Sequence, residues 1–170
     1  MVMKMDLTLL IACALEFIFP AYVANAVPVL AGGGRPLDRG RNFLDGKPIF
    51  GKNKTIRGFL VGLMMGTVVG LAESLVFKYP LSFGFAISLG ALVGDLAGAF
   101  IKRRLGLPPG ELLPIVDQID FIAGAIVFSL PISLQWLSWE LAVTVLIITP
   151  PIHLLTNFGA YKLGLKSNPW

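Results

Sequence analysis

The chain has 170 residues, of which 55% are apolar and 14% are charged, and its formal net charge is +4. Soluble domains carry about a quarter charged residues, so this composition excludes a water-soluble globular protein. The single cysteine and single histidine exclude a disulfide scaffold, a cysteine-based metal site and a multi-histidine metal site. We therefore expect an all-α polytopic membrane protein, with residues 1–170 forming one integral membrane domain and with no nucleic-acid partner.

Five segments are long and apolar enough to cross a bilayer as helices, which takes roughly 20 residues each. In chain order, the expected helices cover residues 7–30, 58–77, 81–101, 115–130 and 137–160. Two of the connecting segments, 32–57 and 102–114, carry several basic residues and are expected to be loops outside the membrane. The sequence thus predicts five transmembrane helices and two basic loops.

The basic residues are distributed unevenly around the predicted helices. If the helices alternate in direction, 12 of the 14 Lys and Arg residues fall on one side, and only Lys4 and Lys78 fall on the other. Lys and Arg concentrate on the cytoplasmic side of membrane proteins. We therefore expect a multi-pass protein of the cell membrane, with its N-terminus outside, its C-terminus in the cytoplasm and both basic loops facing the cytoplasm.

Small residues recur at helical spacing along the second and third predicted helices. The two rows consist of Gly58, Gly62, Gly66 and Gly70, and of Gly90, Gly94 and Gly98. Such rows let two helix backbones approach closely. We interpret them as scaffold that packs helices together, either inside one chain or in a homodimer.

Three aspartates lie at the expected cytoplasmic ends of two consecutive helices. Asp95 comes six residues before the end of the third helix, and the spacing of Asp117 and Asp120 puts both on one face of the fourth. Carboxylates inside a membrane are costly and mark functional sites, and hard oxygen ligands favour Mg²⁺. We expect the three aspartates to bind Mg²⁺. The alternative is that Asp117 and Asp120 offset their helix dipole and pair with residues 102–104.

The basic loop before the second helix has features of an anion-binding site. Thr55 is placed to cap this helix, whose free N–H groups and positive dipole end attract phosphate. Lys54 and Arg57 flank the same point, although the segment lacks the spacing of a P-loop. Together with the aspartates, this pattern suggests a polyphosphate held through a metal at the inner membrane surface. The alternative is ordinary loop charge that binds anionic lipid headgroups.

A few polar residues near the first and fifth helices are less informative. The candidates to line a cavity or to bind a lipid phosphate are Asn25, Pro28, Arg35 and Arg39. The sequence assigns no role to Glu16, in the middle of the first helix, or to His153, in the fifth.

The order of the charged motifs is informative. Gly-Asp-Leu at 94–96 is followed by Lys-Arg at 102–103, a Pro-Gly loop and an Asp-x-x-Asp pair at 117–120. Lys-Thr-Ile-Arg-Gly at 54–58 precedes a glycine-rich helix. This order resembles the signature of the membrane cytidylyltransferases, the CDP-diacylglycerol synthase superfamily. The family's Lys-Lys-Thr/Ser element is similar to residues 54–58.

The resemblance spans essentially the whole chain and points to one branch of the superfamily. The short length, together with residues 36–40 and 45–46, looks like the archaeal branch of CDP-archaeol synthases. The chain departs from the family pattern at Ala99, where a serine is usual, and at Gln118, where an arginine is usual. The loop after the Lys-Arg pair is also shorter than in the family.

The resemblance implies a reaction and a set of site residues. CTP and 2,3-bis-O-geranylgeranyl-glycerol 1-phosphate would give CDP-archaeol and pyrophosphate with the help of Mg²⁺. The residues implied for metal binding and catalysis are Asp95, Asp117, Asp120 and Lys102. The residues implied for CTP binding are Gly51, Lys54, Thr55, Arg57, Gly58 and Arg103.

Other functions are alternatives to this interpretation of the sequence. A bacterial-type CDP-diacylglycerol synthase would use a diacyl lipid, and a CTP-dependent polyprenol kinase would release CDP in place of pyrophosphate. From a different class, a small ion or phosphate transporter also places carboxylates in helices. The five predicted helices show no inverted repeat of the kind that many transporters contain.

Overall fold

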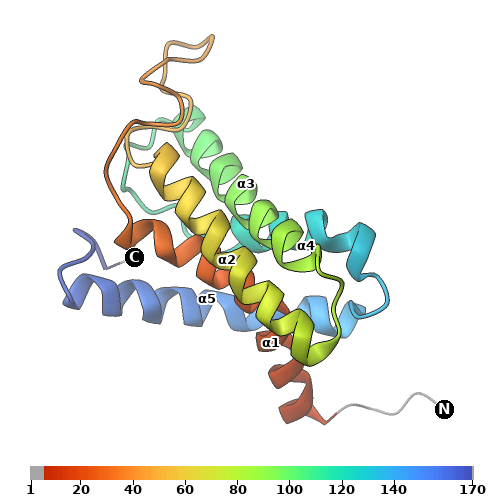
Figure 1. Ribbon diagram of the computed structural model, residues 1–170. Helices are drawn as coiled ribbons and strands as arrows, with labels where there is room; N and C mark the ends of the chain where they lie inside the picture. Colours follow the sequence, from red (N-terminus) through yellow and green to blue (C-terminus); the bar gives the residue numbers. More distant parts are fainter. Residues whose placement is uncertain (1–5, 170) are drawn as a thin grey trace.

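The computed structural model describes residues 6–169, so Lys4 precedes the described region, and within it the regular elements are five helices (Figure 1). These are α1 (Leu7–Leu30), α2 (Ile56–Phe77), α3 (Phe83–Arg104), α4 (Val116–Ser133) and α5 (Trp139–Lys162). All five are long and apolar enough to cross a membrane. Extended pairing within the described residues is limited to two isolated bridges. The predicted fold class, an all-α protein with five membrane-spanning helices, is confirmed.

The helix ends differ from the predicted ones by a few residues. α1 has the predicted bounds, and α4 and α5 extend two or three residues past their predicted ends. α2 begins earlier, at Ile56, because Thr55 Oγ1 accepts the Gly58 amide N–H at 3.1 Å and caps the helix. α3 starts two residues late, at Phe83, and continues through residues 102–104, which the sequence places in a loop, since basic side chains are favourable near a helix C-terminus.

The helices pack around α1, which contacts all four others, while α3 and α4 form the most extensive pair. In Figure 1, α5 lies at a large angle to α2 and α3. It packs on α1 and α4, where Tyr22 Oη lies 2.8 Å from Thr149 Oγ1 and the rings of Phe121 and His153 are 5.8 Å apart. α5 is therefore attached to the bundle through its first half and its middle, where Leu141, Val145 and Thr149 are buried.

Both glycine rows lie at contacts between helices, as the sequence predicts. Gly70 of α2 meets Gly84 of α3, and neither position has room for a Cβ atom. The second row faces α4, with Gly90 and Gly94 against Gly124. This close approach fixes the depth at which the side chains of α4 meet α3. It thereby sets the position of the acidic residues of α4.

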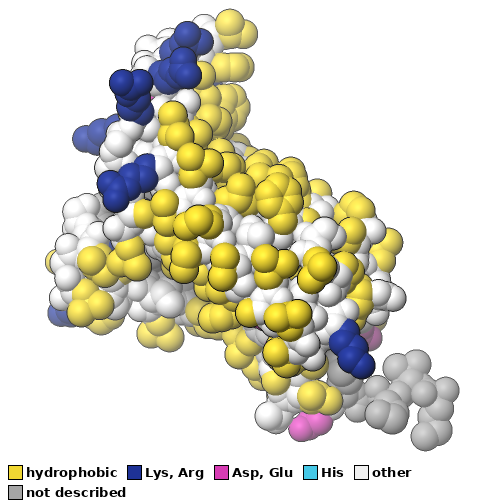
Figure 2. All heavy atoms as spheres, viewed as in Figure 1, with side chains coloured by type: hydrophobic (Ala, Val, Ile, Leu, Met, Phe, Trp, Pro, Cys, Tyr) yellow, Lys and Arg dark blue, Asp and Glu magenta, His cyan; other side chains and the backbone are white. Residues whose placement is uncertain are grey.

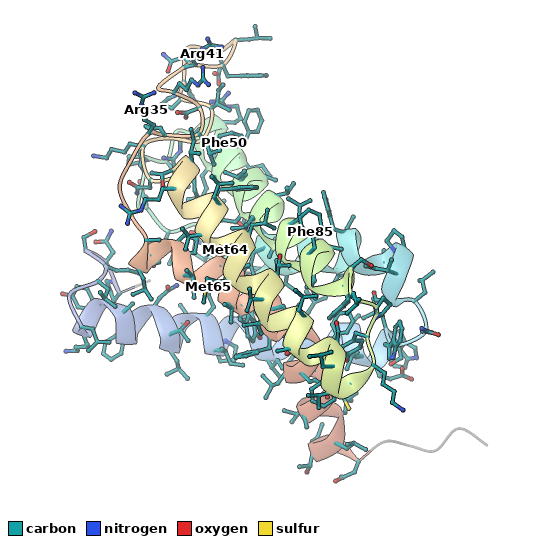
Figure 3. All side chains as sticks on the ribbon, viewed as in Figure 1. Arg35, Arg41, Phe50, Met64, Met65 and Phe85 are labelled. Carbon is teal, nitrogen blue, oxygen red and sulfur yellow. The ribbon has the colours of Figure 1, made fainter. Side chains whose placement is uncertain are left out.

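The surface separates into an apolar flank and a basic end (Figure 2). Large apolar side chains are exposed along the helices, among them Met64, Met65 and Phe85, which Figure 3 labels. Lys and Arg side chains gather over the loop between α1 and α2, which carries Arg35 and Arg41 and projects beyond the end of α2. The apolar flank is the surface suited to contact with lipid, and the basic end lies at its margin.

Candidate active site

The basic end of the bundle contains a cavity of about 630 Å³ that all five helices help to line. Both basic loops and residues 165–168, which follow α5, complete its wall. The charged residues of the lining are Lys52, Lys54, Asp95, Lys102, Arg103, Glu111, Asp117, Asp120 and Lys166. Five cations and four carboxylates thus surround one space in a chain that is mostly apolar.

Lys54 connects the loop before α2 with α3. Its Nζ lies 2.6 Å from both carboxylate oxygens of Asp95. The exposed fractions of the two side chains are 29% and 24%, so the pair faces the cavity and is not sealed in the core. The backbone of Lys54 is held on both sides, since its amide N–H donates to the Gly51 carbonyl at 3.2 Å and its carbonyl accepts from the Leu37 amide at 2.8 Å. Its charge therefore stands directly before the capped N-terminus of α2, where free N–H groups attract anions.

A second ion pair connects α3 with α4. Lys102 Nζ lies 2.7 Å from Asp117 Oδ2, which also accepts the Leu113 amide N–H at 3.0 Å. Asp95 and Lys102 are seven residues apart, which is two helical turns along one face of α3. Both ion pairs consequently border the same cavity.

Asp120 extends from α4 toward α3 at a point where α3 has no side chain. Its Oδ2 lies over Gly98, where even a Cβ atom would overlap the carboxylate. Its Oδ1 accepts the Phe121 amide N–H at 2.6 Å. Asp95 is near enough for the two negative charges to interact. The three aspartates predicted from the sequence therefore line one cavity, and Asp95 and Asp117 each have a lysine partner.

The carboxylates are the residues suited to hold Mg²⁺. Among the described residues, no three Asp, Glu, His or Cys side chains are close enough to form a ready set of metal ligands. Asp95 and Asp117 instead bind separate lysines. Mg²⁺ in enzymes that act on phosphates is usually held by one or two carboxylates, with substrate phosphates and water as its other ligands. The donor set of Asp95 and Asp120, which consists only of carboxylate oxygens, fits that requirement.

Arg103 is a buried cation of the site, with 4% of its surface exposed. Its Nη2 donates to the Pro108 carbonyl at 3.1 Å, whereas Nε and Nη1 have no hydrogen-bond acceptor within residues 6–169. A buried guanidinium with unused donors costs free energy unless water or a ligand accepts from them. Since Arg103 lines the cavity, an anion bound there is placed to be that acceptor.

Asp38 organises the loop between α1 and α2. Its carboxylate accepts three backbone N–H groups, from Gly40 at 2.9 Å, Phe50 at 3.0 Å and Gly51 at 2.8 Å. Burial alone raises the pKa of Asp38, but the hydrogen bonds from Gly51, Phe50 and Gly40 lower it by more, so the pKa lies below its ordinary value. The ionised carboxylate ties the two arms of the loop together and supports the turn that presents Lys54.

Comparisons with known proteins establish the family. Residues 7–170 match the family described as CarS-like, CDP-archaeol synthase. The CDP-archaeol synthases of Methanococcoides burtonii and Pyrococcus furiosus are 41% and 46% identical to this chain; they cover 89% and 92% of it, and 99% and 96% of their own lengths match. The chain belongs to the CDP-archaeol synthase family. Its predicted resemblance to that family is confirmed.

A solved structure supports the fold and the class of protein. A structure described as an intramembrane enzyme for archaeal membrane lipid biosynthesis matches with a TM-score of 0.77 and 41% identity, over 85% of this chain and 92% of that one. The predicted CTP-dependent cytidylyltransferase is the enzyme class to which CDP-archaeol synthases belong. Membrane embedding through five helices agrees with the same match.

Most of the site residues predicted for this CDP-archaeol synthase family member line the cavity. They are Asn25, Pro28, Lys54, Thr55, Gly58, Asp95, Lys102, Arg103, Asp117 and Asp120. Four others do not line it. Gly51 is buried within the loop between α1 and α2, where its amide N–H donates to Asp38. Arg35, Arg39 and Arg57 are exposed on the outer surface of the loop and of α2.

The structure adds lining residues that the sequence does not indicate. α5 contributes His153 and Asn157, whose side-chain nitrogens are 3.1 Å apart, and the segment after α5 contributes Lys166. No motif marks these residues, because they reach the cavity only through the packing of α5 on α1 and α4. Glu16 has a different role, since it accepts the Tyr79 hydroxyl at 2.9 Å away from the cavity.

Proposed function

We propose that this chain condenses CTP with 2,3-bis-O-geranylgeranyl-glycerol 1-phosphate, giving CDP-archaeol and pyrophosphate, in the cavity at the basic end of the bundle. The match to the CDP-archaeol synthase family over residues 7–170 carries the proposal. The cavity supports it, because Lys54, Lys102 and three aspartates line one space at the margin of an apolar bundle. That position suits a reaction between a water-soluble nucleotide and the phosphate of a membrane lipid.

The reaction requires no general base from the protein. A phosphate monoester has a second pKa of about 6 and is mostly dianionic at neutral pH, so its oxygen is already a nucleophile. This oxygen attacks the α-phosphorus of CTP and forms a new P–O bond. The bond from that phosphorus to the oxygen that bridges to the β-phosphorus breaks, and pyrophosphate leaves with the electron pair. The protein's tasks are to neutralise charge and to align the reactants.

Cations of the loop before α2 and of α3 supply the neutralisation. Lys54 and the N-terminus of α2, which Thr55 caps, bind the phosphates of CTP from one side. Lys102 and Arg103 on α3 bind the lipid phosphate or the departing pyrophosphate, as charge-assisted hydrogen-bond donors. Arg103 is suited to this role because two of its nitrogens lack an acceptor within the described chain.

Asp95 and Asp120 would hold Mg²⁺ against the CTP phosphates. When bound, the metal offsets charge on the reacting and leaving phosphates. Lys54 would then exchange the Asp95 carboxylate, now 2.6 Å away, for a phosphate oxygen. Asp117, which the sequence groups with the other two aspartates, is bonded to Lys102 and Leu113, so we assign it to orienting Lys102.

The cavity faces the cytoplasm in this proposal. The concentration of Lys and Arg at this end favours that orientation by the positive-inside rule. Part of the wall is apolar and consists of Val29, Phe59, Leu92 and Leu96. We assign this part to the first carbons of the isoprenoid chains, with the lipid entering sideways between the helices.

The proposal is tested with purified protein, Mg²⁺ and CTP labelled in the cytidine moiety. We expect label to enter the lipid and pyrophosphate to be released, with the geranylgeranyl lipid phosphate preferred over phosphatidate. Preference for phosphatidate would instead indicate a CDP-diacylglycerol synthase. Release of CDP without labelled lipid, when polyprenol is the acceptor, would indicate a kinase. If no lipid supports CTP-dependent chemistry, the proposal is wrong, and flux of ions or phosphate into sealed vesicles becomes the next measurement.

A further inference from the structure

The segment after α5 turns back toward the cavity. α5 ends at Lys162, and Gly164 adopts a left-handed conformation with φ of 72°. The Gly164 amide donates to the Tyr161 carbonyl at 3.0 Å, and the Leu165 amide donates to the Ala160 carbonyl at 2.9 Å. This pair of hydrogen bonds is a helix-terminating motif that reverses the chain direction. The residues after Gly164 are thereby directed back to the site instead of continuing along α5.

A second contact holds the same segment against the cavity. Asn168 Nδ2 donates to the Gly110 carbonyl in the loop between α3 and α4, at 3.1 Å. Lys166 lies between this contact and the end of α5, and it lines the cavity together with Lys54 and Lys102. The segment therefore places a fourth lysine on the cavity wall, after Lys52, Lys54 and Lys102.

The pKa of Lys166 is affected by burial and by the charges of both ion pairs. Burial lowers its pKa first, and the positive charge of Lys54 lowers it further, while the negative charges of Asp117 and Asp95 oppose the shift. Lys166 and the four residues of the two lysine–aspartate pairs line the same cavity. Arg103 and Lys166 add two further cations to the lining that holds the two lysine–aspartate pairs.

We propose that Lys166 binds a phosphate group of a substrate in this cavity, together with Lys54 of the loop before α2 and the cations of α3. The inference rests on the proposed function, because it names a further residue for the same reaction. The ligand chemistry is phosphate, which both the triphosphate of CTP and the lipid phosphate monoester carry. Charge-assisted hydrogen bonds to such groups are worth about 1.5–3 kcal/mol, which corresponds to about a 10- to 100-fold change in binding.

The chain provides a matched control one turn earlier. Lys162 is exposed, and its Nζ lies 5.4 Å from the centre of the Phe158 ring, outside the cavity lining. Lys162→Gln and Lys166→Gln remove the same charge from the same end of the chain. A difference between the two variants therefore reports the position of the charge and not the net charge of the protein.

The experiment measures kcat and KM of both variants with each substrate varied in turn. We expect Lys166→Gln to lower kcat/KM by about 10- to 100-fold, with Lys162→Gln close to wild type and Lys166→Arg intermediate. A higher KM for CTP alone would assign Lys166 to the triphosphate. A higher KM for the lipid alone would assign it to the lipid phosphate. If kcat and both KM values stay at wild-type levels in Lys166→Gln, the proposal is wrong.

A binding measurement separates this inference from the proposed function. The thermal stabilisation of the purified protein by CTP with Mg²⁺, and by the lipid phosphate, is recorded for wild type and both variants. Loss of stabilisation by one of the two in Lys166→Gln alone supports the inference even if the wild-type protein has no cytidylyltransferase activity. A lower melting temperature without ligand, with unchanged stabilisation by both ligands, would show a structural role and overturn it.

Discussion

The two ends of the helix bundle both contain carboxylates within helices, but their surroundings differ. At the basic end, Asp95 and Asp120 line a cavity of about 630 Å³, and Asp95 has a lysine partner. At the other end, Glu16 accepts the hydroxyl of Tyr79, whose ring stacks on Phe83 with 4.5 Å between the ring centres. The carboxylates at the basic end face a polar space, whereas Glu16 is half-buried and bound to the hydroxyl of an aromatic residue.

This contrast shows that depth in the membrane is not enough to identify a catalytic carboxylate. Glu16 and Asp95 are both costly to place in helices, yet each is stabilised in its own way. Glu16 accepts from a neutral hydroxyl and does not line the cavity, so no ligand bound there replaces its partner. Asp95 has a charged partner on a different element and an open cavity, so its partner can be replaced by a ligand.

The largest effect is expected for Asp95→Asn. The amide removes the charge that pairs with Lys54 and that would hold the metal ion. We expect activity to fall by at least about 10²–10³-fold, the usual loss for a group that stabilises transition-state charge. Because the pair is partly exposed, its loss has little effect on folding, which the melting temperature in detergent would check. Near-normal turnover would remove Asp95 from the proposed mechanism.

A smaller effect is expected for Gly98→Ala, which pushes a methyl group into the carboxylate of Asp120. Overpacking of this kind costs about 1–3 kcal/mol, and displacing Asp120 should reduce turnover at least tenfold by the same charge-stabilisation argument. Gly159→Ala is the matched control, since no atom lies within 4 Å of the added Cβ. Stability and activity of both variants would be compared. Equal behaviour of the two would contradict the role given to the contact between α3 and α4.

At the opposite end of the bundle, Tyr79→Phe should affect stability alone. It leaves Glu16 without its hydroxyl donor, which should cost about 1 kcal/mol because a half-buried acceptor loses its partner. The rate of CDP-archaeol formation should remain at the wild-type level. Glu16→Gln keeps an acceptor for Tyr79 and should be less destabilising. A large loss of turnover in the folded Tyr79→Phe variant would show that the two ends are not independent.

The smallest effect is expected for Asp38→Asn, which acts on the loop that presents Lys54. An amide has one acceptor oxygen where the carboxylate has two, so at least one of the three N–H groups loses its acceptor. We therefore expect KM for CTP to rise about threefold to tenfold, which is about 1 kcal/mol. The pKa of Asp38 is lowered in the folded state. Its contribution to stability is therefore present above the ordinary aspartate pKa of about 3.9 and is lost as the pH falls below it. The difference in melting temperature between wild type and variant should be constant near neutral pH and shrink below about pH 4.

The sequence predicted the bundle well, because long apolar segments and basic loops are local features. It also predicted the cap at Thr55 and the shared location of Asp95, Asp117 and Asp120, since helical spacing determines which residues share a face. The closeness of Lys54 to Asp95 could not be predicted, because the two residues lie on different elements and 41 positions apart.

The contributions of α5 and of Asp38 could not be predicted for a related reason. Lys166 reaches the cavity through the turn at Gly164 and the angle at which α5 packs, and neither leaves a periodic pattern in the sequence. Arg57 shows the reverse case. It is adjacent to the site in the sequence, but its position on α2 turns it to the outer surface.

The two lysine–aspartate pairs also bear on which anions the cavity accepts. A bare anion that approaches Lys54 or Lys102 must compete with a carboxylate already 2.6 or 2.7 Å away, and its success would leave that carboxylate without its cationic partner. An anion that arrives with its own cation satisfies the lysine and the aspartate in one exchange. If Mg²⁺ binds as proposed, the site would favour a nucleotide in its metal complex over free inorganic phosphate, a discrimination made by paired charges before any base or lipid chain is recognised.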